Sequence, residues 1–253
     1  MGVIYKNVNY DYCAMLIISI LIITTILRRM IKGKVNRSFL EVLVVAWLTI
    51  LFDIWAVHLD NLGVQQVFTK YVAHMGYLVL HSLEMPFYIT YLVAMTDTWH
   101  LFKAKRLLAF LSSFPVLVIT GLILTSPATK WIFYINAQYE YTRGKYFTLL
   151  YVCAVIYLIY GLVYLGIHRK MFRRRYLVSL GIVFVAEIAG VAIQYFYPMS
   201  LVEMLCMSIG LLFISLMLQR PEERLDVVTG LNKITAYMDD MRHAFRTRKP
   251  IHI

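Results

Sequence analysis

Residues 71–95, YVAHMGYLVLHSLEMPFYITYLVAM, decide the fold class, because they form a long apolar run whose polar residues follow a helical pattern. About 20 helical residues are enough to cross the hydrocarbon core of a bilayer. The polar side chains are spaced by three or four positions, which places them on one stripe of an α-helix. They are His74, Tyr77, His81, Glu84 and Tyr88. The stretch therefore predicts a membrane helix with one polar stripe facing protein or water.

The rest of the chain has the same character, with 60% hydrophobic and only 15% charged residues. Apolar runs long enough to cross a bilayer occupy approximately residues 10–27, 39–57, 71–95, 107–124, 146–167, 176–197 and 200–218. Lipid offers no hydrogen-bond partners to an exposed backbone, so such runs must be helices. We predict an all-α fold, a polytopic membrane bundle of seven transmembrane helices within residues 1–219.

Basic residues between the predicted helices indicate the orientation, because short cytoplasmic loops carry an excess of Lys and Arg. Alternate loops are rich in them: Arg28, Arg29, Lys32, Lys34, Arg37, Lys103, Lys105, Arg106, Arg169, Lys170, Arg173, Arg174 and Arg175. The N-terminal segment and the opposite loops carry few: Lys6, Lys70, Lys130, Arg143 and Lys145. The pattern predicts a multi-pass protein of the cell membrane with its N-terminus outside and its C-terminus in the cytoplasm.

The net charge of +11 is explained mainly by these loops, which suit the anionic headgroups of a lipid bilayer. Because the basic residues adjoin predicted helices and form no separate patch, no nucleic-acid partner is expected. The three cysteines, Cys13, Cys153 and Cys206, lie within or at the edge of apolar runs. They predict neither a disulfide framework nor a zinc site.

The segment after the last apolar run has a different composition and carries the phrase DVVTGL at residues 226–231. Tyr237 follows, then an amphipathic run through Phe245 and the strand-like KPIHI. This order resembles the start of a GGDEF domain, the nucleotidyl-cyclase-like module of cyclic di-GMP signalling. The resemblance implies that residues 220–253 are a linker and the N-terminal fragment of a cytoplasmic α/β domain, including its first helix.

A complete GGDEF domain would use GTP and magnesium and would act as a homodimer, as the resemblance implies. Its signature loop and metal-binding carboxylates would lie beyond Ile253, so no catalytic residue or cofactor site is expected in this segment. Lys233 and Ile234 stand where the family motif has Asn and Arg. A degenerate GGDEF domain attached to an EAL phosphodiesterase domain therefore remains an alternative to a diguanylate cyclase.

A second resemblance lies in residues 130–147, KWIFYINAQYEYTRGKYF. This loop resembles the corresponding loop of the histidine-kinase-type N-terminal seven-span sensor region of bacterial signalling proteins. By composition alone it predicts an aromatic belt at the membrane surface and a turn or hairpin that serves as a lid. The lid residues are predicted to be Trp131, Tyr134, Tyr141 and Arg143.

Ionisable side chains are costly in hydrocarbon, so those within predicted spans are candidates for a site. We predict a ligand-binding set made of Asp53, His74, Tyr77, His81, Glu84, Glu187, Gln194 and Glu203. Lys and Arg are absent from the predicted spans, which favours a cationic or hydrogen-bond-donating extracellular ligand of unknown identity over an anion. Two alternatives remain: interhelical hydrogen bonds that only hold the bundle together, and a metal site at His74, His81 and Glu84. The metal site is the least favoured, and none is predicted.

These patterns lead to one functional hypothesis, a membrane signal sensor that regulates an attached cyclic di-GMP enzyme domain through movement of the last helices. The predicted coupling residues between the bundle and that domain are Pro221, Asp226, Thr229, Gly230 and Leu231. Enzymatic activity is expected only if the chain continues beyond residue 253. The alternatives are the seven-helix sensor of a histidine kinase, or a receptor or transporter without an attached enzyme.

Overall fold

The computed structural model describes residues 8–27, 34–63, 65–96, 98, 106–172, 174–197 and 201–218. The linker and the GGDEF-like fragment predicted for residues 220–253 lie outside these ranges, and so do all the predicted coupling residues. The described residues form the helical bundle and one hairpin.

The described part of the chain is helical except for one small hairpin. Its long helices are α1 (Asn9–Leu27), α2 (Lys34–Asn61), α3 (Val67–Thr96), α5 (Arg106–Thr129), α6 (Thr148–Ile167), α7 (Arg174–Phe196) and α8 (Glu203–Leu218). A 3-10 turn, η2 (Arg169–Met171), follows α6, and strands β1 (Phe133–Ile135) and β2 (Tyr141–Arg143) lie between α5 and α6. All seven predicted spans therefore correspond to helices in the described residues.

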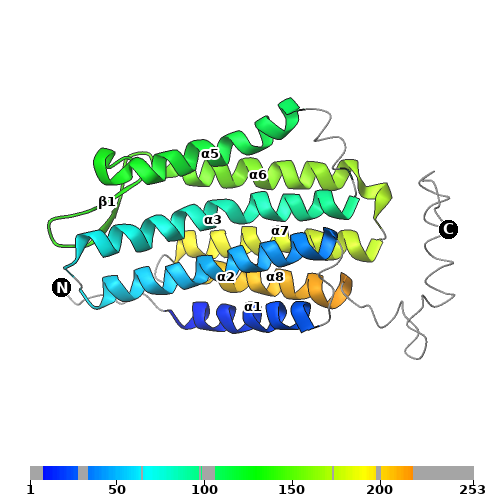
Figure 1. The fold of residues 1–253 in the computed structure, drawn as a ribbon, viewed down its shortest axis with the longest axis horizontal. Coiled ribbons are helices and arrows are strands. Elements are labelled where there is room, and N and C mark those ends of the chain that lie inside the picture. Colours follow the sequence, from blue (N-terminus) through cyan, green and yellow to red (C-terminus); the bar gives the residue numbers. More distant parts are fainter. Residues whose placement is uncertain are drawn as a thin grey trace.

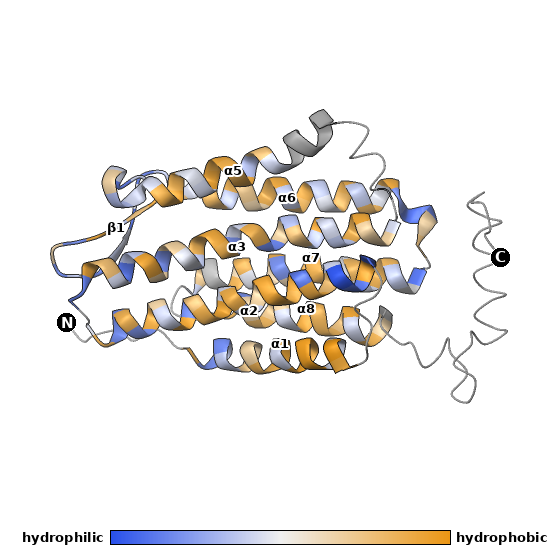
Figure 2. Cartoon of the chain, viewed as in Figure 1, coloured by the Kyte–Doolittle hydropathy of each residue, from blue (hydrophilic) through white to orange (hydrophobic). Residues whose placement is uncertain are grey.

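Five of these helices, α1, α2, α3, α6 and α7, are long and apolar enough to cross a membrane. Their outward faces are apolar, as the α6 series Leu149, Val152, Ile156, Ile159 and Val163 illustrates. Figure 2 shows hydrophobic residues along the bundle and hydrophilic residues at the hairpin and near the start of α7. Exposed apolar area on this scale marks contact with lipid or with a partner. Together with the span lengths, it indicates a membrane protein.

The other two helices, α5 and α8, contain shorter apolar segments, Ser113–Thr129 and Glu203–Met217. At about 1.5 Å per residue, the 16 residues of α8 extend roughly 24 Å, less than the thickness of about 30 Å of a bilayer core. Helix α8 begins only at Glu203, although the apolar run begins earlier. Glu203, the first residue of α8, is buried in the bundle.

The helices run side by side with roughly parallel axes (Figure 1). Helix α2 packs along α3 and α7 packs along α8, while α1 contacts both α2 and α8. Helices α5 and α6 cover the other side of α3. Helix α3 is thus the element that most other parts of the bundle surround, and its polar stripe faces the interior.

Small residues allow the closest helix contacts. A methyl group at Gly190 of α7 would lie 2.9 Å from the Cα atom of Glu203, so α8 approaches the α7 backbone directly at this point. Residues of ordinary size cannot pack this closely without moving a backbone. The first turn of α8 is consequently fixed against the part of α7 that carries Glu187.

The hairpin between α5 and α6 pairs Phe133 with Arg143 and Ile135 with Tyr141. Its turn is organised by Asn136, whose side-chain oxygen accepts hydrogen bonds from the backbone of Gln138 and Glu140 at 2.9 and 2.8 Å. At its base, a Cβ atom on Gly144 would lie only 2.3 Å from the Trp131 carbonyl oxygen, so only glycine fits. The predicted turn or hairpin is therefore present.

Candidate ligand-binding site

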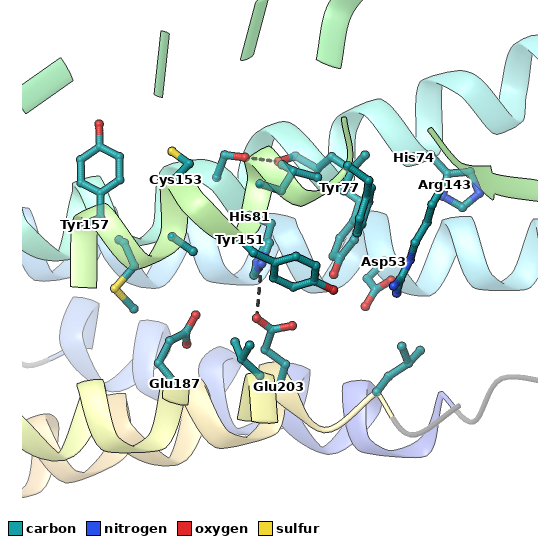
Figure 3. Close-up of a pocket in the computed structure, with 18 of the residues that line it drawn as sticks. Asp53, His74, Tyr77, His81, Arg143, Tyr151, Cys153, Tyr157, Glu187 and Glu203 are labelled. Atoms are coloured by element: carbon teal, nitrogen blue, oxygen red, sulfur yellow. Dashed lines mark hydrogen bonds and ion pairs between the residues drawn. The ribbon is translucent and has the colours of Figure 1, made fainter. Parts of the chain in front are cut away.

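A cavity of about 150 Å³ lies inside the bundle, between α2, α3, α6, α7, the start of α8 and strand β2 (Figure 3). Its ionisable and aromatic lining residues are Asp53, His74, Tyr77, His81, Tyr141, Arg143, Phe147, Tyr151, Cys153, Tyr157, Glu187 and Glu203. The remaining lining is mostly aliphatic. A small concave site with a few convergent polar groups is the usual form of a ligand pocket.

His81 is the centre of the polar contacts in this cavity. Its Nε2 atom lies 3.3 Å from Oε1 of Glu203, and its Nδ1 atom lies 3.5 Å from Oε2 of Glu84. The ring also stacks on Tyr77 of the same helix, with centroids 5.7 Å apart. A doubly protonated imidazole has an N–H group on each side and can serve both carboxylates. Glu203 is further stabilised because it lies in the first turn of α8, at the positive end of the helix dipole.

Glu187 is the cavity-lining carboxyl group that has an oxygen without a hydrogen bond from any described residue. Its side chain reaches from α7 into the cavity (Figure 3), yet the residue is only 6% exposed. Its Oε2 atom accepts no hydrogen bond from any described residue, and neither do the oxygens of Glu84. A buried polar atom without a partner costs free energy, so native proteins rarely retain one without a reason. A ligand bound in the adjacent cavity can donate the missing hydrogen bond to Glu187.

Asp11 of α1 extends the acidic cluster behind the cavity. It is fully buried, it lies close enough to Asp53 and Glu203 to interact with them electrostatically, and its carboxylate oxygens accept no hydrogen bond within the described ranges. The sequence interpretation missed this residue because Asp11 stands at the edge of the first apolar run. The rule that singled out Asp53 would also have found it if applied to the run ends.

Arg143 brings a positive charge to the hairpin end of the cavity. It lines the cavity from β2, and Figure 3 shows its guanidinium directed toward Asp53. The Arg143 side chain also lies over the Phe147 ring, with 4.7 Å between the guanidinium carbon and the ring centroid. The expectation of a lining without Lys or Arg holds for the described helices that surround the cavity, but the loop supplies an arginine.

Tyr141 fixes the hairpin against α3. Its ring lies on His74 with centroids 4.4 Å apart and stacks on Phe133 at 5.6 Å. Burial raises the pKa of the Tyr141 phenol well above its ordinary value, and the nearby Arg143 only partly offsets this effect. Tyr141 therefore stays a neutral hydroxyl at any ordinary pH. This part of the predicted lid is a packed wall of the cavity.

Another polar cluster, which we call the Lys70 cluster, lies near the start of α3, between α2 and the hairpin. Nζ of Lys70 donates to the Tyr139 carbonyl oxygen at 2.6 Å and lies 3.5 Å from Oδ1 of Asp60. His74 Nε2 lies 3.3 Å from the same Asp60 oxygen. The sequence interpretation placed Lys70 in a loop, but α3 begins at Val67, so Lys70 is a helical residue only 1% exposed.

The wall opposite α3 is formed by α6, whose contribution the sequence did not reveal. Phe147, Leu150, Ala154 and Tyr157 recur at spacings of three and four, and all line the cavity. Val116 of α5 donates its backbone N–H to the Tyr157 oxygen at 3.2 Å, which holds the tyrosine in place. Tyrosines do not stand out in such an apolar run, so only this spacing could have indicated the cavity face.

Most of the predicted ligand-binding residues line this one cavity: Asp53, His74, Tyr77, His81, Glu187 and Glu203. Glu84 does not line the cavity, but its Oε2 atom lies 3.5 Å from Nδ1 of His81, which does. Gln194 belongs to α7, but its side chain is outside the described parts of the structure.

Of the predicted lid residues, Tyr141 and Arg143 line the cavity, whereas the other two do not. Trp131 is 45% exposed and meets Tyr146 edge-on, and the Tyr134 ring has the ammonium group of Lys130 5.9 Å from its centroid. The prediction that they close over a ligand receives no support from their position.

Within the described residues, no group of three or more His, Cys, Asp or Glu side chains is arranged to hold a metal ion. His74 and His81 contact different carboxylates, on α2 and on α3 and α8 respectively. Comparison of the chain with family models, with curated proteins and with solved structures found no match. The interpretation of the site consequently rests on its own geometry.

Proposed function

We propose that the chain is a membrane sensor that binds a small ligand in the cavity between α3, α6, α7 and α8 and transmits its presence along α8. The observation that carries this proposal is a cavity of about 150 Å³ bordered by the unsatisfied carboxylate of Glu187. The alternative, in which the polar residues only form interhelical hydrogen bonds, does not explain a cavity beside this carboxyl group.

The position of Glu203 supports a route from the cavity to the tail. Glu203 lies in the first turn of α8 and contacts His81 of α3 at one end, while α8 ends at Leu218, close to the proposed linker. A ligand that changes the environment of Glu203 acts on the helix that leads into residues 220–253. Such a change shifts a population only if the ligand binds the two states with different affinity.

The proposed output is regulation of an attached cyclic di-GMP enzyme domain, either a cyclase or a phosphodiesterase, in a homodimer. Its support is the resemblance of residues 226–231 to the opening of a GGDEF domain and of residues 130–147 to a bacterial sensor loop. The proposal assigns Pro221, Asp226, Thr229, Gly230 and Leu231 to the coupling between sensor and domain.

The test uses the protein encoded by the complete reading frame, expressed in a bacterial host. Cellular cyclic di-GMP is measured by mass spectrometry while small molecules of graded charge are supplied outside the cells. We expect one charge class to change the cyclic di-GMP level. The His81→Leu, Glu187→Gln double variant should lose that response while reaching the membrane in the same amount as the parent protein.

A two-residue Ala-Gly insertion after Pro221 tests the coupling separately from the cavity. We expect the insertion to uncouple the output from the ligand, because it rotates and displaces whatever follows the linker. A response that survives both the double variant and the insertion would contradict the proposed function. A reading frame without a cyclic di-GMP domain would contradict the output while leaving the cavity proposal standing.

A further inference from the structure

We propose that the ligand of this cavity is a small organic ammonium ion, whose nitrogen lies between Glu187 and Glu203 and whose apolar part lies against α6. This inference rests on the proposed ligand-binding function and adds the chemical class of the ligand. It is carried by the charge around the cavity, by the unsatisfied oxygen of Glu187 and by the composition of the opposite wall.

The ionisable groups around the cavity are mostly acidic among the described residues. The carboxylates are Asp11, Asp53, Glu84, Glu187 and Glu203. Against them stand the guanidinium of Arg143 and the imidazole of His81, because Lys70 and His74 are engaged with Asp60. An anion would face this cluster in a medium of low dielectric constant, whereas a cation reduces the repulsion. The excess of acidic over basic groups therefore favours a cationic ligand.

The hydrogen-bonding pattern favours a ligand with a hydrogen-bond donor next to Glu187 and Glu203. Oε2 of Glu187 is a buried acceptor without a donor among the described residues, and Oε1 of Glu203 contacts one nitrogen of the His81 imidazole. Glu187 and Glu203 are close enough to interact electrostatically and belong to helices that touch at Gly190. An ammonium group carries two or three N–H donors on one small centre, so it can serve both carboxylates at once.

The size and lining of the cavity select an organic ion over a bare metal ion. A cavity of about 150 Å³ admits a molecule the size of benzene, which has about six non-hydrogen atoms. Val191 and Leu201 provide an aliphatic surface beside the carboxylates, and Tyr151 and Tyr157 provide aromatic rings on α6. Aromatic faces attract ammonium ions as well as alkyl groups. A metal ion would leave this apolar space unfilled.

Three probes of similar size but different charge test the inference: n-butylammonium, 1-butanol and butyrate. Their binding to the full chain in lipid nanodiscs is measured by saturation-transfer NMR titration. We expect n-butylammonium to bind at least about tenfold more tightly than 1-butanol, the equivalent of about 1.4 kcal/mol, and butyrate to bind most weakly. Glu187→Gln and Glu203→Gln should each remove that advantage.

Glu41→Gln is the matched control, because Glu41 makes only a half-exposed ion pair with Arg37 on α2, away from the cavity. It should leave the preference for n-butylammonium unchanged. Val191→Lys provides a second test that does not remove a carboxylate. Val191 follows Glu187 by one helical turn and lines the cavity, so a lysine there supplies a tethered ammonium group. It should abolish n-butylammonium binding, whereas Val191→Met should only weaken it.

Equal or tighter binding of 1-butanol or butyrate would overturn the ammonium inference but leave a ligand-binding cavity in place. Absence of binding by all three probes would overturn the inference as well, and the cellular cyclic di-GMP response then judges the proposed function independently. Unchanged n-butylammonium binding in Glu187→Gln, Glu203→Gln and Val191→Lys would place the probe elsewhere and also overturn the inference.

Discussion

Helix α3 carries two polar clusters that differ in one respect, the balance between their charges. At the first, Lys70 and His74 surround Asp60, and the hairpin supplies the Tyr139 carbonyl oxygen as a further acceptor. At the second, His81 is shared between Glu84 and Glu203, while Glu187 keeps an oxygen without a donor among the described residues. The first cluster is complete by itself, and the second is not.

The difference separates a structural cluster from a candidate site. A buried ion pair costs desolvation free energy and is kept when its geometry satisfies every group. The Lys70 cluster meets this condition and ties α2, α3 and the hairpin together. The Glu187 cluster fails the condition and borders a cavity. We therefore expect mutations in the first cluster to change stability and mutations in the second to change ligand binding.

The largest effect is expected from Lys70→Met, which removes the buried cation from the partly buried Asp60 and from the Tyr139 carbonyl oxygen. Breaking a buried pair by removing one partner costs about 3–5 kcal/mol. The free energy of unfolding in mixed micelles measures this loss. Lys145→Met is the control, because Lys145 is an exposed residue of the loop that also carries Tyr139, and its ammonium group lies over the Tyr146 ring, 5.6 Å from the centroid. Equal stability of the two variants would contradict the assignment of a structural role.

Gly144→Ala is expected to have the next largest effect, because its methyl group would overlap the Trp131 carbonyl at the base of the hairpin. Overpacking of this kind costs about 1–3 kcal/mol. Circular dichroism during thermal unfolding should show a lower midpoint. Gly121→Ala on α5 is the control, because a Cβ atom there meets nothing within 4 Å and alanine favours the helix. A lower midpoint for Gly121→Ala as well would remove the steric explanation.

A smaller loss, about 1–2 kcal/mol, is expected from Gly190→Ala, which forces α7 and the first turn of α8 apart. Because Glu203 moves with that turn, the variant should also bind n-butylammonium more weakly than the parent protein. Gly181→Ala on the same helix has free space for its methyl group and should leave both properties unchanged. Binding that is insensitive to Gly190→Ala would argue against the close α7–α8 contact as part of the site.

The smallest effect is expected from Glu187→Gln, and its sign is opposite to that of Lys70→Met. Replacing this buried carboxyl group, whose Oε2 atom has no donor among the described residues, by an amide of the same shape should stabilise the ligand-free protein by about 1 kcal/mol. Differential scanning fluorimetry without ligand provides the measurement, with Glu41→Gln as a neutral reference. A clear loss of stability on Glu187→Gln would mean that this carboxylate is a structural partner, as in the first cluster.

The sequence was sufficient for those features that depend on periodicity and composition. The spacing of His74, Tyr77 and His81 predicted that they share a face, and the structure brings them to one cavity with Asp53, Glu187 and Glu203. The seven helical segments were predicted from apolar runs that lipid or a core must cover. By length and composition, five of the helices are established as candidate spans, so seven crossings and their orientation remain predictions.

Features that depend on tertiary contacts were not predictable. The Lys70 cluster was missed because Asp60 and Lys70 lie on opposite sides of a turn, beyond the ends of the apolar runs. Asp11 was missed because it stands at the edge of the first apolar run. The hairpin turn was indicated by composition, but the contact of Tyr141 with His74 depends on how the loop folds back onto α3.

The account predicts a negatively charged cavity that admits cations, and Cys153 lies in its wall as a natural reporter. The decisive measurement is the rate at which methanethiosulfonate reagents modify Cys153 in a Cys13→Ser, Cys206→Ser protein in nanodiscs. Each rate is divided by the rate with 2-mercaptoethanol. We predict that the aminoethyl reagent reacts at least about tenfold faster than the sulfonatoethyl reagent, that n-butylammonium slows it, and that Glu187→Gln removes the preference. Equal normalised rates, or a preference for the anionic reagent, would contradict the account.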